Sequence, residues 1–151
     1  MRTPKKQVTR DKADATISGT RLQHAAFHTS DALQARDFYG RILGLTEIVR
    51  PELISKGVWY SVGPSQEIHI TISDASEVPN TGRPLNPKLR GLEGRHLAFS
   101  VDNLDNTKRK LDAEGIPYVG SNDRLPQIFL EDPDGNLIEI NSNWADQTSV
   151  S

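Results

Sequence analysis

The sequence predicts an α+β protein of one domain, made of two fused βαβββ modules. A length of 151 residues suits a single domain. The first observation behind this prediction is an internal repeat, because the segment His24-Ala-Ala-Phe returns as His96-Leu-Ala-Phe about 70 residues later. The second is strict alternation of apolar and polar residues in several short segments, which indicates half-buried strands. Each unit also has an Asp-x-Leu helix start, a glycine after the helix and a closing strand, in the same order.

The first module is predicted over residues 21–73. An alternating strand runs from Leu22 to Thr29, and Ser30 or Asp31 offers a cap for the helix that follows. That helix is predicted over 32–43 and ends at Gly44. Three strands follow at 46–50, 58–62 and 68–72. The apolar stripe expected to face the core of the helix comprises Leu33, Phe38, Ile42 and Leu43.

The second module is predicted over residues 94–143, after a proline-rich stretch at 74–93 that we interpret as a linker, one that could cover the site. Its strand spans 95–101 and its helix 103–114, with Asp102 as the cap and Gly115 after the end. The remaining strands are expected at 116–119, 127–130 and 136–140. The turn from Asp132 to Gly135 is interpreted as structural, and residues 144–151 as a frayed end.

Composition and charge exclude several function classes. Without cysteine there is no disulfide, no thiolate metal site and no cysteine nucleophile. A net charge of −2 provides no general attraction to nucleic acid or to an anionic membrane. Residues 1–20 hold five basic residues against two acidic ones and no aromatic residue, so we interpret them as a solvated, disordered tail. With no long apolar run and no signal-peptide pattern, a cytoplasmic location is expected.

Four side chains are predicted to form one metal site. Because successive strand residues face opposite sides of a sheet, His24 and His96 lie on the face opposite the apolar residues of their strands. His69 and Glu139 take the same place in the two closing strands. The chain has only 4 histidines, and three of them occupy these repeated positions. Imidazole nitrogens and a carboxylate suit one divalent cation, namely Zn, Ni, Mn, Co or Fe.

Three further residues are candidates for substrate binding. His28 shares a face with His24, Trp59 lies on a strand of the same module, and Arg124 precedes a strand that faces the site. Each also has a structural interpretation, since a strand aromatic is more often part of the core and surface arginines are common. Arg50 is a candidate of the same kind as Arg124.

These residues resemble a known family, the vicinal oxygen chelate superfamily, which includes glyoxalases, bleomycin-resistance proteins and ring-cleaving dioxygenases. The resemblance covers roughly residues 21–142. It implies paired modules in a U-shaped half-barrel around a metal, with His24, His96 and Glu139 as ligands. It depends on four segments: His24 with Phe38-Tyr39-x-x-Ile42-Leu43-Gly44-Leu45, Ile68-His69-Ile70, His96-x-Ala98-Phe99-x-Val101, and Asp132-Pro-Asp-Gly-Asn-Leu-Ile-Glu139.

One position departs from the pattern. Glyoxalase I and the related epimerase usually have Glu or Gln where His69 stands, so a proton shuttle between two symmetric carboxylates is in doubt here. The resemblance implies a glyoxalase-like lyase or isomerase that binds vicinal oxygens of a small substrate to the cation, with Glu139 as ligand and catalytic base. The alternatives are an Fe(II) dioxygenase, a thiol transferase and a drug-binding protein without a metal. A homodimer is expected, because relatives pair their modules within one chain or across two.

Overall fold

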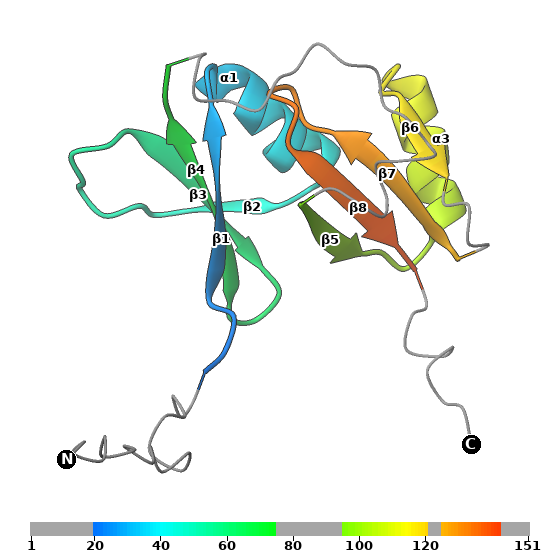
Figure 1. The fold of residues 1–151 in the computed structure, drawn as a ribbon, viewed down its shortest axis with the longest axis horizontal. Helices are drawn as coiled ribbons and strands as arrows, with labels where there is room; N and C mark the ends of the chain where they lie inside the picture. Colours follow the sequence, from blue (N-terminus) through cyan, green and yellow to red (C-terminus); the bar gives the residue numbers. More distant parts are fainter. Residues whose placement is uncertain (1–19, 75–94, 121–124, 143–151) are drawn as a thin grey trace, which may run out of the picture.

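The computed structural model describes residues 20–74, 95–120 and 125–142, and these form two four-stranded sheets with a helix beside each (Figure 1). The predicted tail, linker and C-terminal end fall almost wholly outside the described residues. No helix among the described residues has the length and apolar character needed to cross a bilayer. The predicted α+β class and the two βαβββ modules are confirmed.

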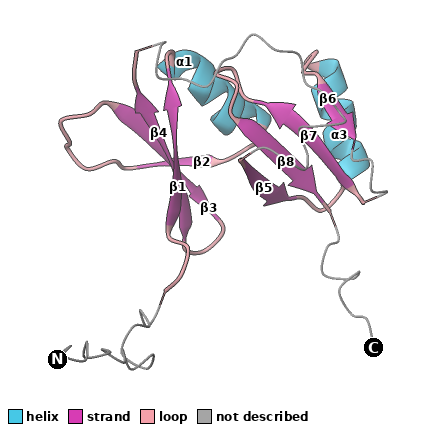
Figure 2. Ribbon diagram, viewed as in Figure 1, coloured by secondary structure: helices cyan, strands magenta, loops and turns pink. Residues whose placement is uncertain are grey.

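The first module contains β1 (His24–Thr29), α1 (Ala32–Ala35), η2 (Arg36–Ile42), β2 (Thr46–Ile48), β3 (Gly57–Val62) and β4 (Gln66–Ile72). Its sheet has the order β1-β4-β3-β2, in which β1 pairs parallel with β4 and the other pairs are antiparallel. The second module contains β5 (His96–Ser100), α3 (Leu104–Ala113), β6 (Tyr118–Gly120), β7 (Gln127–Glu131) and β8 (Leu137–Asn141). Its sheet repeats the topology as β5-β8-β7-β6 (Figure 2).

The first helix differs from the single α-helix predicted over 32–43. After one α-helical turn the chain widens into the π-helix η2, where the amide of Leu43 donates to the carbonyl of Phe38. Both Phe38 and its neighbour Tyr39 are buried there. Leu33, expected on the core stripe, is instead 76% exposed. The predicted cap is confirmed, because the Asp31 carboxylate accepts from the amides of Leu33 and Gln34.

The second helix begins one residue later than predicted. Asn103, rather than Asp102, is the N-cap, and its side-chain oxygen accepts from the amide of Asn106. The glycines predicted after each helix are confirmed as C-terminal residues, since Gly44 and Gly115 have φ of 76° and 67°. The strand predicted over 116–119 is shorter and later, because Pro117 cannot donate to the ladder.

The apolar strand faces of both modules join one core with η2 and α3. Its largest fully buried members include Tyr39, Tyr60, Ile70, Leu111, Ile128, Leu130, Ile138 and Ile140. Tyr39 and Leu111 come from the helices, and the others occupy alternate strand positions, so the His24 and Glu139 positions are left on the opposite faces. The period-two pattern therefore places the candidate site residues as the sequence predicted.

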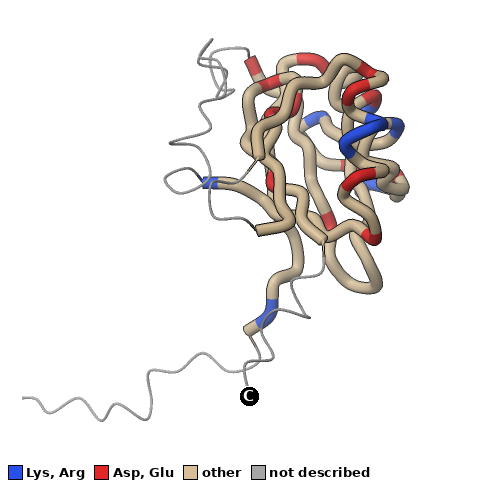
Figure 3. Tube along the Cα trace, turned by 90° about the vertical axis from the view of Figure 1, so that its right-hand side faces the viewer, with Lys and Arg blue, Asp and Glu red and all other residues tan. Residues whose placement is uncertain are grey.

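Polar contacts also join the modules. The turn between β7 and β8 reaches the first module, where Asp134 accepts hydrogen bonds from the amide and hydroxyl of Ser30 at 3.0 and 2.8 Å. The Lys110 ammonium on α3 donates to the carbonyl oxygens of Arg41 and Ile42 at the end of η2. In Figure 3 acidic and basic residues are scattered over the described chain, without an extended basic stripe there.

Candidate metal centre

In the first module, the polar face of the sheet carries a stack of three rings. Trp59 on β3 is the register partner of His69 on β4, which in turn pairs with Ala26 on β1. The Trp59 and His69 rings are stacked with centroids 3.7 Å apart, and the His69 and His24 rings with centroids 4.2 Å apart. The sheet register thus brings His24 and His69 together, as the sequence predicted.

Glu67 is a site residue that the sequence analysis missed. Its carboxylate Oε2 lies 2.7 Å from Nε2 of His69, and its backbone position is the register partner of His24. The hydrogen bond from His69 lowers the pKa of Glu67. The sequence could have indicated this neighbour, because Glu67 precedes His69 by two residues in the same predicted strand, and side chains two residues apart lie on the same face.

In the second module, His96 on β5 and Glu139 on β8 form a direct pair. Nε2 of His96 lies 3.0 Å from Oε2 of Glu139, which is buried. The other carboxylate oxygen accepts from Nδ2 of Asn141 at 2.9 Å, and the side-chain oxygen Oδ1 of Asn141 accepts from the Ser100 hydroxyl at 2.8 Å. A chain of hydrogen bonds therefore holds the Glu139 carboxylate in one orientation.

Gln127 adds an acceptor without a partner. It is the register partner of Asn141, so its side chain belongs to the same face of the sheet as Glu139. It is 9% exposed, and its Oε1 atom is buried with no hydrogen-bond partner. A buried polar atom without a partner costs roughly 1–3 kcal/mol. A hydroxyl or a cation-held water arriving beside Glu139 would remove that cost.

The His96–Glu139 pair fits a divalent cation. Ligand bonds of roughly 2.0–2.2 Å from nitrogen and carboxylate oxygen put two ligand atoms of one cation about 3 Å apart. The observed separation of 3.0 Å is that of a direct contact between the two side chains, and it is compatible with this value. Asn141 supplies the further hydrogen bond that metal-binding carboxylates commonly receive.

The single chain arranges the four predicted ligands as two groups. His24 and His69 belong to the first sheet, while His96 and Glu139 belong to the second, and no β-ladder joins the sheets among the described residues. Within the described part of this one chain, no three His, Asp or Glu side chains converge in a way that could enclose a cation. A cavity of about 130 Å³ lies where the first sheet meets β5, lined by His24 and Glu67 on one side and by Ala98 on the other. Of the four predicted ligands, His24 alone lines it.

The three residues predicted to bind substrate lie in different surroundings, and one of them lies outside the described residues. Nδ1 of His28 lies 2.6 Å from the Ser73 hydroxyl, so one ring nitrogen is engaged at the end of β4. Trp59 is stacked on His69, and Arg50 lies over its ring at 5.9 Å from the centroid. Arg124 lies outside the described residues. Substrate binding by these residues stays a prediction.

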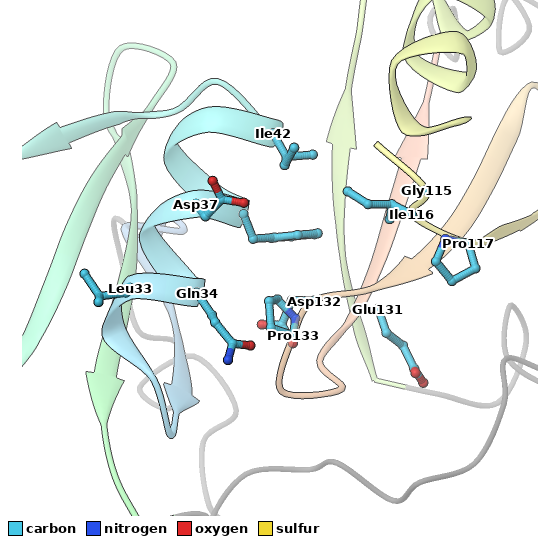
Figure 4. A pocket seen from close by; sticks show the side chains of 11 residues that line it. Leu33, Gln34, Asp37, Ile42, Gly115, Ile116, Pro117, Glu131, Asp132 and Pro133 are labelled. Atoms are coloured by element: carbon cyan, nitrogen blue, oxygen red, sulfur yellow. The ribbon is translucent and has the colours of Figure 1, made fainter. Parts of the chain in front are cut away.

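A larger groove of about 650 Å³ lies elsewhere, between η2 and the second module (Figure 4). Phe38 and Ile42 line one wall, and Ile116, Pro117 and Pro133 line the other. None of the predicted ligands lines it. Asp132, which also lines it, is engaged with Tyr39 at 2.7 Å. We therefore place the candidate metal centre on the polar sheet faces rather than in the larger groove.

The chain therefore belongs to the class of proteins that are built from two βαβββ modules of identical topology. Histidines and a carboxylate lie on matching strands of its two modules. Comparison with known families agrees with this description. The chain belongs to the Glyoxalase/Bleomycin resistance protein/Dioxygenase superfamily, whose model matches residues 21–140.

Individual relatives are distant. The protein named Glyoxylase I 4 of Arabidopsis thaliana is 29% identical over 127 residues, covering 80% of this chain and 70% of the relative. Among solved structures, a putative glyoxalase family protein from Bacillus anthracis is 29% identical with a TM-score of 0.63, covering 82% of this chain and 95% of that one. A lactoylglutathione lyase from Agrobacterium tumefaciens is 24% identical with a TM-score of 0.57, covering 84% of this chain and 96% of that one, and supports the fold.

Proposed function

We propose that this protein is a metal-dependent lyase or isomerase of the glyoxalase type, acting on a small substrate with vicinal oxygens. The observation that carries the proposal is the His96–Glu139 pair, whose 3.0 Å separation suits two ligands of one divalent cation. The names of its relatives, Glyoxylase I 4 and lactoylglutathione lyase, support the same reaction class. The family resemblance extends the ligand set to His24 and His69. Because an imidazole coordinates in its ring plane, the His24 ring would have to turn out of its stack on His69 for both to hold one cation.

The cation and three side chains of the second module have separate roles in this reaction. A bound divalent cation supplies Lewis acidity that stabilises negative charge developing on the substrate oxygens. The Glu139 carboxylate accepts the proton of the hydroxyl-bearing substrate carbon and returns it to the neighbouring carbonyl carbon, while the hydroxyl proton passes to the oxygen of that former carbonyl. Asn141 holds the carboxylate through Oε1, so that the proton-accepting group stays oriented. The unpartnered Oε1 of Gln127 accepts a hydrogen bond from a substrate hydroxyl or from an ordered water.

We further propose that the protein works as a homodimer. The two ligand groups lie on different sheets, and β1 and β5 each have one strand neighbour among the described residues. An edge strand offers unpaired backbone groups to another chain. A second copy that sets its β5 beside β1 of the first would combine His24 and His69 of one chain with the partner's His96 and Glu139.

Metal content and turnover test the function together. We expect about one Zn, Ni, Co, Mn or Fe ion per site in purified wild-type protein measured by plasma mass spectrometry, because the chain offers imidazole and carboxylate ligands but no thiolate. Lactoylglutathione, the compound in the name of the Agrobacterium tumefaciens relative, is the test product, and the Glu139→Gln variant should lose its formation. Glu114→Gln is the control, since Glu114 forms an exposed ion pair with Arg41.

The metal analysis also separates the alternatives. Iron retained in a His69→Ala variant would favour a dioxygenase with a two-histidine, one-carboxylate site. Wild-type protein that takes up no divalent metal after dialysis against each ion would refute the enzyme and leave a ligand-binding protein. Full activity of Glu139→Gln would refute its role as the base.

Mixing two inactive variants tests the dimer. A chain with His24→Ala and His69→Ala retains the second ligand pair, whereas a chain with His96→Ala and Glu139→Gln retains the first. If sites combine modules from two chains, a mixture refolded together should regain up to about a quarter of wild-type activity, because half of the dimers are mixed and each then has one intact site. No recovery, together with a monomeric mass by light scattering, would contradict the shared site.

A further inference from the structure

The His69 ring is enclosed on both faces. Trp59 covers one face with the planes inclined by only 1°, and His24 covers the other with an inclination of 13°. Centroid distances of 3.7 and 4.2 Å leave no room for a ligand between the rings. Access to this imidazole from a cation or a substrate is therefore through its edge.

One nitrogen on that edge is already engaged. Nε2 of His69 lies 2.7 Å from Oε2 of Glu67. An ionised carboxylate only accepts hydrogen bonds, so the imidazole nitrogen is the donor. A neutral imidazole with its proton on Nε2 has its lone pair on Nδ1.

The outer end of the stack is also held. The Arg50 guanidinium lies over the Trp59 ring at 5.9 Å from its centroid, a cation–π distance. One guanidinium nitrogen donates to the carbonyl oxygen of Ser55 at 2.7 Å and lies 2.8 Å from the Ser55 hydroxyl. The segment between β2 and β3 thus supports Trp59 on the face away from His69, and the His69 ring plane is fixed through two layers.

The histidine of the second module, His96, has a different set of neighbours. The position equivalent to Glu67 is Leu137, the register partner of His96, and leucine cannot accept a hydrogen bond. There the Nε2 atom of His96 meets Glu139 directly. A separate carboxylate beside the histidine therefore belongs to the first module alone, where histidine replaces the Glu or Gln usual in glyoxalase I relatives.

We propose that Glu67 is a positioning residue for His69, fixing the proton on Nε2 while Trp59 fixes the ring plane, so that His69 presents Nδ1 to the divalent cation. This inference builds on the proposed function. A carboxylate that orients a ligand histidine typically contributes 10–100-fold to metal affinity. At the position where glyoxalase I relatives usually have Glu or Gln, this chain has His69, and the carboxylate of Glu67 orients its imidazole.

The first test uses metal-free protein. Long-range proton–nitrogen correlation spectra of the imidazoles, assigned with single histidine variants, should show the Nε2–H tautomer for His69 in wild type. Glu67→Ala should convert it to a mixture, and Glu67→Gln should retain part of the preference, since the amide oxygen still accepts. Ser61→Ala is the matched control, because Ser61 faces Glu67 across the β3–β4 ladder without a contact to His69. An Nδ1–H tautomer in wild type, or an unchanged tautomer in Glu67→Ala, would overturn the proposal.

The second test is zinc titration of the full chain in a Trp144→Phe background, where Trp59 is the remaining tryptophan. Stacking on His69 makes Trp59 fluorescence a reporter of zinc binding. We expect affinity to fall about 10–100-fold in Glu67→Ala and to stay unchanged in Ser61→Ala. Equal affinity in wild type and Glu67→Ala would overturn the proposal. Wild-type protein that binds no zinc, nickel, cobalt, manganese or iron would instead refute the proposed function, and the metal-free spectra would still decide whether Glu67 sets the tautomer.

Discussion

The hydroxyl of Tyr39 donates a 2.7 Å hydrogen bond to the buried carboxylate of Asp132, and this contact joins the two modules. Tyr39 lies on η2 of the first module, whereas Asp132 begins the turn between β7 and β8 of the second. The same carboxylate accepts from the amides of Asp134 and Asn136, which shapes the turn. One carboxylate thus serves the local turn and the packing of the modules.

Removing that hydroxyl should destabilise the fold. Tyr39→Phe leaves the ring in place but removes a buried hydrogen bond to a carboxylate, so we expect a loss of about 1.5–3 kcal/mol in the free energy of unfolding, measured with urea. Tyr118→Phe is the control, because its hydroxyl lies 3.4 Å from Asp112 in an exposed setting. An equal loss in the free energy of unfolding in both variants would show that the hydrogen bond from Tyr39 stabilises the fold no more than an exposed one.

Asp132 should also make stability depend on pH. Burial raises the pKa of Asp132 above its ordinary value of 3.8. A carboxyl with a raised folded-state pKa stabilises the fold most where it is protonated in both states, and that contribution falls as pH rises from about 3.8 through the folded-state pKa. Asp132→Asn does not titrate. The stability of wild type relative to Asp132→Asn should therefore fall between pH 3.5 and neutrality, and a rise would contradict the raised pKa.

Lys110 should stabilise the junction between α3 and η2. Its ammonium donates to the last carbonyl oxygens of η2 at 3.2 and 2.7 Å, where a positive charge also complements the helix dipole. We expect Lys110→Met to lose about 0.5–1.5 kcal/mol in urea unfolding. Lys108→Met on the same helix is the control, since Lys108 forms only a 3.6 Å exposed ion pair with Asp105. A loss in Lys108→Met as large as in Lys110→Met would contradict the capping role.

Gln127 should lower the stability of the metal-free fold while increasing substrate affinity. Replacing the buried Gln127 amide, whose Oε1 has no partner, with leucine removes a desolvation cost, so Gln127→Leu should gain about 1 kcal/mol in the free energy of unfolding of the metal-free protein. The same variant should weaken substrate affinity, because the acceptor beside Asn141 and Glu139 is lost. A variant that is less stable and has unchanged affinity would show that Gln127 is an ordinary packing residue.

Much of the fold could be predicted from the sequence. Period-two alternation placed His24, His96 and Glu139 on the polar faces of their strands, and the repeat predicted equal topology for both modules. These properties are local, because neighbouring side chains along a strand set them. The π-helix was not predicted from the local pattern, and one of the residues that it buries, Tyr39, contacts Asp132 of the second module.

For the site, the sequence by itself determined which residue types share a sheet face and which strands carry them. The tertiary structure decided which of them touch. Register set Trp59 against His69, and it paired His96 with Glu139 and Gln127 with Asn141. The contact between Glu67 and His69 is local, because both residues lie on one face of β4. The reason is that strand pairing is non-local: the sequence pattern gives the facing of each strand, while the partner and the register depend on how distant segments pack into one core.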